Sequence, residues 1–122
     1  MIDRHLTITL RADWRAALRQ AGGRAKAPEY QGEVLNFESP GAFFSRLSEK
    51  RWALVRELQG HGEIAIRELA RRVGRDVKRV HQDVGVLTEL GLVERGSGGG
   101  VVCPFVEVHI DMRLQPATAS AA

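Results

Sequence analysis

The sequence has few of the residues on which several protein classes depend. It contains a single cysteine, Cys103, which excludes an internal disulfide and a secreted disulfide-stabilised scaffold. Aromatic residues make up only 6% of the 122 residues, and the apolar runs are too short to cross a membrane. No basic stretch followed by an apolar stretch opens the chain, so we expect no secretory signal. These absences predict a cytoplasmic protein.

The sequence also has only a small excess of positive over negative charge. Lysine and arginine number 18 and aspartate and glutamate 15, so the net charge is +3, far below that of a basic tail. Hydrophobic residues make up 43%, which is enough for a folded core. The length suits one domain, or a small core with appendages. Composition alone therefore predicts a small globular protein and names no function.

The residues that build catalytic and metal sites are scattered. No zinc-ligand spacing relates the four histidines, which are His5, His61, His81 and His109. Glu107, His109 and Asp111 alternate along one expected strand, but no nucleophile accompanies them, and charge pairing across strands explains them. Cys103 has no partner cysteine; we interpret it as a partly buried strand residue, with a redox sensor as the alternative. We expect no enzyme, no metal site and no cofactor.

The chain divides into three zones. Residues 1–47 form an N-terminal extension of strands and helix that could serve dimerisation or docking. Residues 48–113 carry the densest helical pattern. Residues 114–122 are small, nearly uncharged and predicted to be a disordered tail.

The N-terminal zone alternates strand and helix signals. Residues 5–10 alternate polar and apolar side chains, which predicts a half-buried strand. Residues 13–21 predict a helix, 24–32 a loop and 32–38 a second short strand. Ser39 and Pro40 then have the pattern of a helix start, a capping side chain followed by proline. The side chains expected to point inward from that helix are Phe43, Phe44 and Leu47.

A longer helix is predicted from Glu49 to Gln59. Ser48 is its expected cap, and Gly60–Gly62 breaks it. Its apolar residues cover more than one face, so we expect a helix buried on two sides. Trp52 is expected to dock on the N-terminal zone or on a second subunit. The alternative that the aromatic residues line a small-molecule pocket stays open.

The next two helices form the pattern that carries the function. A short helix is expected around Ile66–Val73, ending at Gly74, and a second one over Val77–Leu90, capped by Asp76 and stopped by Gly91. Two helices joined by a short turn that contains glycine are typical of a helix-turn-helix. The second helix of that motif normally lies in the major groove of DNA.

Charge is concentrated on these two helices. Between Arg67 and Arg79 there are six basic and two acidic residues, an excess of four positive charges, so the rest of the chain nets −1. A helical projection places the core stripe of the second helix on Val77, Val80, Val84, Leu87 and Leu90. The side chains expected to face outward are Arg75, Lys78, Arg79, Gln82, Val86 and Glu89. Gly85 is expected at the edge of that outward face and His81 near the core edge.

The outward side chains have the chemistry of DNA recognition. Arginine or lysine can bind guanine or phosphate, and glutamine can bind adenine. The candidate DNA-binding residues are therefore Arg75, Lys78, Arg79, Gln82, Arg67, Arg71, Arg72 and Arg95. The alternative is a solvated helix face, and it is strongest for the first helix, where Glu68 and Arg72 can pair at i,i+4.

A glycine-rich hairpin follows the second helix. Residues 97–100 are expected to form its tip, and in this position the hairpin would be a wing from which Arg95 reaches a phosphate or the minor groove. No Lys-Ser/Thr pair follows the glycines, so a phosphate-cradling loop is a poor explanation. The strand after the hairpin alternates like residues 6–10, and we expect these two strands to pair, within one chain or across a dimer.

The stretch "ELARRVGRDVKRVHQDVGVLTELGLVER" resembles winged helix-turn-helix regulators of the MarR/ArsR type, and "LTELGLVER" resembles their transition from recognition helix to wing. "VGRDVKRVHQDV" and the lead-in "FESPGAFFSRLSEKRWALVREL" are similar to a prokaryotic group described as DNA-binding proteins. The resemblance covers roughly residues 33–112. It implies a possible antitoxin role, because some members of that group neighbour small toxin genes. Ala65 departs from the usual Ser or Thr cap, which would weaken the first helix by about 1 kcal/mol.

Together these observations predict an α+β fold, a winged helix-turn-helix with an N-terminal strand-helix extension and a long C-terminal strand. The predicted function is a homodimeric regulator of transcription, a repressor, that binds double-stranded DNA with residues 77–90 in the major groove. The alternative is an antitoxin, or another protein-interaction module, that neutralises a partner protein and regulates its own operon.

Overall fold

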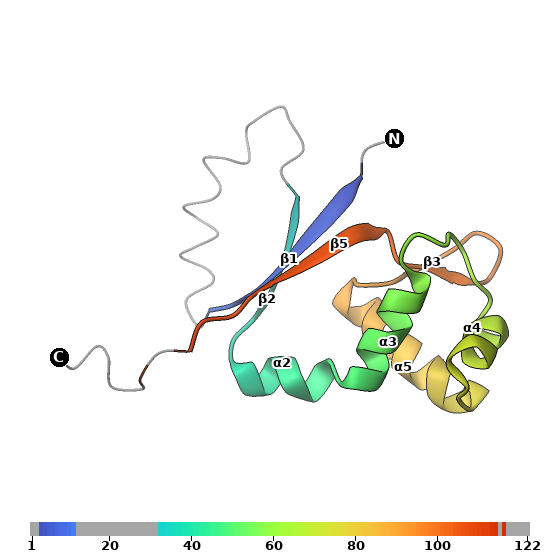
Figure 1. The fold of residues 1–122 in the computed structure, drawn as a ribbon, viewed down its shortest axis with the longest axis horizontal. Helices are drawn as coiled ribbons and strands as arrows, with labels where there is room; N and C mark the ends of the chain where they lie inside the picture. The colour runs from blue at the N-terminus through green and yellow to red at the C-terminus, as the bar shows by residue number, and fades with distance from the viewer. Residues whose placement is uncertain (1–2, 12–31, 115, 117–122) are drawn as a thin grey trace.

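The structure is a computed structural model that describes residues 3–11, 32–114 and 116 (Figure 1). The helix expected over residues 13–21, most of the loop after it and most of the C-terminal tail lie outside the described residues. The fold is mixed α/β. Its elements in chain order are β1 (Arg4–Leu10), β2 (Glu33–Phe37), α2 (Pro40–Arg46), α3 (Glu49–Leu58), α4 (Ile66–Val73), α5 (Val77–Leu90), β3 (Glu94–Arg95), β4 (Val101–Val102) and β5 (Phe105–Asp111).

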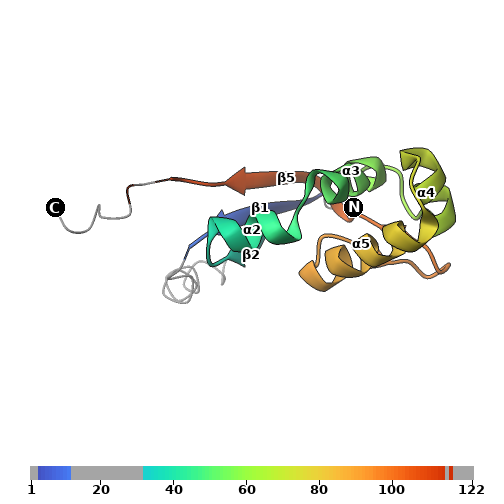
Figure 2. The same ribbon diagram turned by 90° about the horizontal axis from the view of Figure 1, so that it is seen from below.

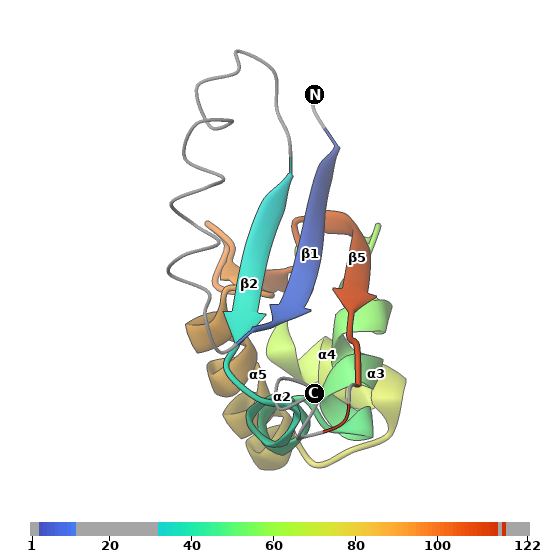
Figure 3. The same ribbon diagram turned by 90° about the vertical axis from the view of Figure 1, so that its left-hand side faces the viewer.

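β1 is the central strand of a three-stranded parallel sheet with the order β2-β1-β5 (Figure 3). Ile8 of β1 lies opposite Leu35 of β2 on one side and Ile110 of β5 on the other. Both strands predicted in the N-terminal zone are present, and the expected pairing of the first strand with the last is confirmed. It occurs within one chain.

The two faces of this sheet differ in polarity. Leu6 and Ile8 point into the core and are 4% and 0% exposed, while the alternate residues of β1 lie on the opposite, polar face. Figure 2 shows α4 and α5 gathered at one end of the molecule, with β5 running away toward the other end. The parallel sheet therefore extends away from the end of the molecule that α4 and α5 form.

The start of α2 and that of α3 are fixed by serine side chains. Ser39 accepts a hydrogen bond from the backbone N–H of Ala42, and Ser48 accepts one from that of Arg51, as the sequence predicted. Phe43 is buried and its ring meets that of Phe37 edge-to-face at 5.4 Å. Phe44 was expected to point inward, which is wrong: it is 60% exposed, because it lies one residue further round a helix that only buries one side.

A single hydrophobic core joins the first two zones. Its buried residues come from β1, β2 and α2 as well as from α3, α4, α5 and the strands after them. Trp52 packs against this core, with its ring 6.3 Å from that of Phe43, so it docks on the N-terminal zone. The boundary at residue 47 therefore separates two sequence patterns and not two cores.

The C-terminal apolar run is divided between two sheets. β4 pairs antiparallel with β3 in a small hairpin, whereas β5 joins the parallel sheet. Cys103 and Pro104 lie between them, and Pro104 has no N–H with which to continue a strand ladder. The sequence predicted one long strand here, and the proline explains the difference. No helix in the described part of the chain is both long and apolar enough to cross a membrane.

Candidate nucleic-acid interface

The helix pair α4 and α5 has the predicted boundaries. Gly74 ends α4 in the left-handed conformation, with φ of 67°, and residues 74–76 make the turn. The carboxylate of Asp76 then accepts a hydrogen bond from the backbone N–H of Arg79 at 3.3 Å, which begins α5. Ala65 makes no side-chain cap on α4, as its sequence predicted. The turn is thus fixed at one end by the backbone conformation of Gly74 and at the other by the side chain of Asp76.

The inner face of α5 packs on the core. Val80, Val84 and Leu87 are at most 1% exposed, which confirms the centre of the predicted stripe. Val77 was also placed on this stripe but is 43% exposed, because the first residue of the helix projects past the helices beneath it. The inner face therefore fixes the rotation of α5 about its axis.

The outer face of the first turns of α5 carries Lys78, Arg79 and Gln82, all exposed as expected. Gly85 is half-buried, and a Cβ built on it would meet no other atom of the described residues within 4 Å. His81 is exposed as well, so its expected position near the core edge is wrong. These residues make a surface of two cations, an amide and an imidazole.

Four of the candidate cations have no carboxylate partner within the described ranges. No ion pair of the described residues involves Arg67 of α4, Lys78 and Arg79 of α5, or Arg95 of β3. All four are exposed. They are therefore available to an external anion.

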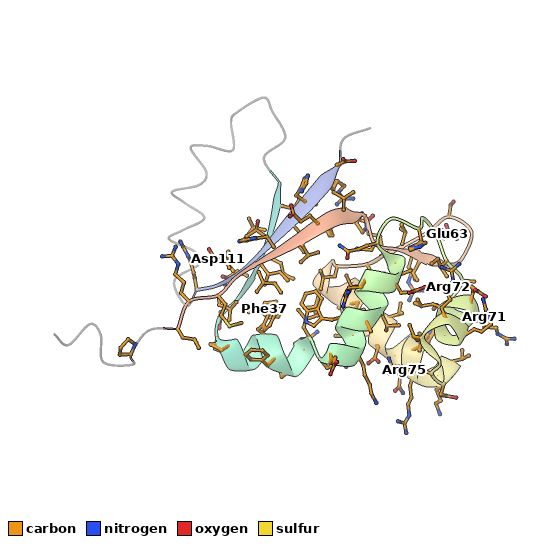
Figure 4. The ribbon with its side chains drawn as sticks, in the orientation of Figure 1. Phe37, Glu63, Arg71, Arg72, Arg75 and Asp111 are labelled. Atoms are coloured by element: carbon orange, nitrogen blue, oxygen red, sulfur yellow. The ribbon has the colours of Figure 1, made fainter. Side chains whose placement is uncertain are left out.

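Arg71 and Arg72 are held by α4 itself. The Glu68 carboxylate accepts hydrogen bonds from Arg71 Nε at 2.8 Å and from Arg72 Nε at 3.1 Å. These bonds lower the pKa of Glu68 to about 2 and raise that of Arg71. Arg72 also lies 3.7 Å from Glu57 of α3. Figure 4 shows both arginines on α4, at the end of the molecule away from Asp111.

Arg75 does not point outward as expected. Its Nη2 donates a hydrogen bond to Asp83 Oδ2 at 2.7 Å, and its side chain is only 19% exposed. Asp83 also accepts a bond from Arg51 Nε at 3.0 Å, and Arg51 in turn donates to the Arg46 carbonyl. Burial acts to raise the pKa of Asp83, but the hydrogen bonds from Arg75 and Arg51 outweigh it and the pKa is lowered. This network ties the turn and α5 to α3.

The hairpin tip after β3 is fixed from a distance by Glu63. The Glu63 carboxylate accepts hydrogen bonds from the backbone N–H of Gly98 at 3.3 Å and of Gly100 at 2.9 Å. A Cβ on Gly96 or Gly98 would collide with that carboxylate, and one on Gly100 with the Ile64 carbonyl. At Gly100 the backbone of Ile64 leaves no room for a side chain, whereas at Gly96 and Gly98 a side chain would displace the Glu63 carboxylate from the tip. The hairpin that carries Arg95 is therefore supported by Glu63 and Ile64.

The comparison with known families covers all of these elements. A family model, HVO_A0114, matches residues 46–110, more than half of the chain. The chain belongs to the HVO_A0114 family. The matched segment runs from the end of α2 through most of β5 and contains every candidate residue, but not β1 or β2. Searches of the curated proteins and of the solved structures give no significant match.

The sequence missed three side chains that shape this surface in the HVO_A0114 family member. Asp83 holds Arg75, Arg51 holds Asp83, and Glu63 holds the hairpin. A helical projection shows that Asp83 lies off the outer face of α5, but not which cation reaches it from the turn. The signal for Glu63 is the glycine-rich run at 96–100, which indicates that another part of the chain approaches the backbone closely.

Cys103 is buried, 5% exposed, and its Sγ lies 3.7 Å from the Phe105 carbonyl. Burial raises the pKa of its thiol, which suppresses the reactive thiolate. The sequence predicted Cys103 to be a partly buried strand residue; it is instead buried and lies between β4 and β5, where it makes an isolated bridge with Gln59. Its burial disfavours the redox-sensor alternative.

Proposed function

We propose that α3, α4, α5 and the β3–β4 hairpin form a winged helix-turn-helix that binds double-stranded DNA. In this proposal the first turns of α5 enter the major groove, and the hairpin is the wing. The observation that carries it is the outer face of α5, where Lys78, Arg79 and Gln82 are exposed while the opposite face is buried in the core. In this orientation, α5 presents its cations and its amide to a ligand from its N-terminal end.

The free cations favour a polyanionic ligand. Salt bridges within the protein occupy Arg71, Arg72 and Arg75, whereas the four unpaired cations (Arg67, Lys78, Arg79 and Arg95) lie on α4, α5 and the hairpin. Neutralising phosphates with such groups releases counterions and supplies most of the affinity for DNA. The resemblance to MarR/ArsR regulators points to the same ligand.

Each residue then has a distinct role. Arg79 and Lys78 can bind guanine or phosphate, and Gln82 can form the paired hydrogen bonds that distinguish adenine. Arg95 reaches a phosphate or the minor groove from the hairpin. Arg75 is assigned to holding the turn instead of contacting DNA, because Asp83 already engages it. We propose a homodimeric repressor whose two α5 helices occupy half-sites about one helical turn apart.

The test is a titration of a fluorescent duplex at several salt concentrations. A pool of random-sequence duplexes reports non-specific binding, and sequencing of the bound fraction reports the preferred site. Affinity for the pool is expected to fall steeply between ~50 and ~200 mM salt. No binding at the lowest salt would overturn the proposal.

The matched pair of variants is Arg79→Ala and Arg113→Ala. Each removes one exposed arginine, but Arg113 follows β5 near Asp111, at the other end of the molecule. Arg79→Ala is expected to cost about 1–3 kcal/mol on the preferred site and to relax one base position, or to reduce the salt slope by about 1 if it binds phosphate. Arg113→Ala should change neither. Equal losses for both variants would show that only net charge matters.

An antitoxin or other protein-interaction module is the second candidate, favoured by one observation. β5 and the parallel sheet extend away from α4 and α5, and DNA binding leaves that surface unused (Figure 2). Purification of a stoichiometric complex with a protein encoded by a neighbouring gene would support this function. It is compatible with DNA binding, because the two surfaces are separate.

A further inference from the structure

We propose that the free edge of β5 pairs with β5 of a second copy of this chain, antiparallel and centred on Val108. The two three-stranded sheets would then form one continuous sheet of six strands. This inference assigns a surface to the dimer, and it does not depend on DNA being the ligand.

The exposed side chains of β5 motivate the proposal. β5 is an edge strand of the sheet as far as the structure describes the chain, so the main-chain groups on its free side have no strand to pair with. At its start, the Phe105 carbonyl accepts a hydrogen bond from Gln59 Nε2 at 3.3 Å. Val106 and Ile110 are 51% and 41% exposed, although both are large and apolar. An edge of this length with exposed apolar side chains is suited to pairing with another strand.

A shallow groove lies alongside this edge. Its volume is about 360 Å³, and it separates β5 from α3. Trp52, Val55 and the stem of Arg56 form the α3 side, and Val106, Val108 and Ile110 form the strand side. Apolar side chains brought to the edge by a second strand would enter this groove and remove both surfaces from water.

The charges on β5 select the register of the pairing. In an antiparallel pair centred on Val108, Glu107 lies opposite His109 of the second copy, and the same pair repeats across the two-fold axis. A shift by one residue toward either end would place Glu107 opposite itself or opposite Asp111 of the second copy. Two carboxylates directly opposite each other destabilise a sheet, whereas a carboxylate opposite an imidazole can form a hydrogen bond, so the register at Val108 is favoured.

The apolar face agrees with this register. Centring on Val108 brings Val108 against its own copy and Ile110 beside Val106 of the second copy. Glu107 already lies 3.2 Å from His5 of its own strand pair, so its carboxylate would be shared between two imidazoles. The sequence of β5 is thus complementary to itself on both faces of the sheet.

The other described edge of the sheet lacks this self-complementarity. β2 has only five residues, and the carboxylate of Glu33 is taken by Arg4 at 2.7 Å. An antiparallel pair centred on Leu35 would oppose Val34 and Asn36, with no charge pair to set its register. Val34 is nevertheless 66% exposed, which makes it a suitable control position.

The symmetry places both helix pairs on one side of the sheet. Antiparallel pairing at an edge requires a two-fold axis perpendicular to the sheet, and rotation about that axis keeps each face on its own side. Because the helices of each copy cover the same face, both copies of α5 would lie on one side of the joined sheet. A dimer of this form can engage one extended ligand with two equivalent surfaces.

The test is sedimentation equilibrium of the full chain and three variants. The unmodified chain is expected to be dimeric at concentrations on the order of 10 µM. His109→Glu opposes two carboxylates at both ends of the pair, and should raise the dissociation constant by roughly tenfold or more. The double variant Glu107→Lys with His109→Glu restores opposite charges and should recover the dimer. Val34→Glu, at the other edge, should leave it unchanged.

Circular dichroism of each variant shows that the chain is folded when its mass is measured. A monomeric unmodified chain, whether alone or captured by a different protein, would overturn the proposal. Failure of the double variant to restore association would overturn the register at Val108. Dissociation by Val34→Glu, with His109→Glu still dimeric, would move the interface to β2. A variant that loses the dimer but still binds a short DNA duplex as a monomer would leave the DNA-binding proposal intact. Failure of the dimer proposal can therefore be distinguished from failure of the DNA-binding proposal.

Discussion

The helical end and the sheet end of the molecule are stabilised by contacts of different range. At the helical end, α4 and α5 are bounded by Gly74, Asp76 and Gly91, each acting on residues within one turn of itself. At the sheet end, β1 is held between β2 and β5, which come from distant parts of the chain. The comparison teaches that the bounds of α4 and α5 are set mainly by nearby residues, whereas the sheet forms only when distant parts of the chain meet.

The two ends also use charge differently. On the outer face of the sheet, His5 pairs with Glu107, and beside it Arg4 pairs with Glu33. On α5 the exposed cations have no partner among the described residues, and the one acid with buried contacts, Asp83, points toward α3. Charge at the sheet end is therefore mostly neutralised within the chain, and charge at the helical end is left for a ligand.

The largest expected effect on stability comes from creating a cavity in the core, at either end of the molecule. Ile8→Ala in β1 and Leu87→Ala in α5 each remove a fully buried side chain, and each should lower the free energy of unfolding by about 2–5 kcal/mol. Because one core joins the two ends, both variants should unfold in a single transition at a lower temperature. Thermal unfolding followed by circular dichroism measures this, with the exposed Val34→Ala as a control of small effect. Separate transitions for sheet and helices would show that the two ends are independent.

An intermediate effect is expected from Asp83→Asn. The substitution leaves the guanidinium groups of Arg51 and Arg75 without a carboxylate, and should cost about 1–3 kcal/mol in urea unfolding. Glu89→Gln removes an acid from the same helix. The Glu89 side chain is 74% exposed, so its ion pair with Arg46 should contribute less than about 1 kcal/mol to stability. Equal losses would mean that the Asp83 network does not hold the turn.

The same variant predicts a pH dependence. The pKa of Asp83 is lower in the folded chain, so its contribution to stability is present above the ordinary pKa of an aspartate, about 3.9, and is lost as the pH falls through the lowered value. The unmodified chain should therefore lose stability below about pH 4 more steeply than Asp83→Asn does. Part of the loss should persist in the variant, because the pKa of Glu68 is lowered too. Parallel curves for the two proteins would contradict the assignment.

The smallest expected effect is a gain in stability. A Cβ at Gly85 meets open space, so Gly85→Ala should stabilise α5 by about 0.5–1 kcal/mol through helix propensity. If the backbone at Gly85 approaches DNA, the same methyl group should weaken duplex binding, so that stability and affinity move in opposite directions. Gly41→Ala in α2 is the control that should leave affinity unchanged. Unchanged affinity in Gly85→Ala would place this residue outside the contact.

The sequence predicted the helical end almost residue by residue, because its signals are local. The C-terminal ends of α4 and α5 follow from Gly74 and Gly91, and the start of α5 from Asp76, whereas the start of α4 follows from the helical period alone because Ala65 makes no cap. Their exposed faces follow from the helical period. What could not be predicted there is the inward turn of Arg75, because a projection of one helix does not show a carboxylate reached from the preceding turn.

The sheet end was predicted in outline only. The alternation of polar and apolar residues predicted that the first and last strands pair. The same alternation is expected whether the partner strand lies in the same chain or in another copy, so it could not decide between the two. The break at Pro104 was missed because the apolar pattern continues through it. The glycine-rich tip indicates a close approach to its backbone, but not that Glu63, more than thirty positions away, is the group that approaches.

The bond between Glu63 and the glycine tip has a consequence for recognition. A hairpin of glycine and serine would ordinarily lose much conformational entropy on meeting a ligand. Here that loss has already occurred during folding, because the carboxylate holds two amides of the tip in place. The same carboxylate occupies the hydrogen-bonding positions of these two amides, so they are not available to a phosphate while Glu63 holds the tip.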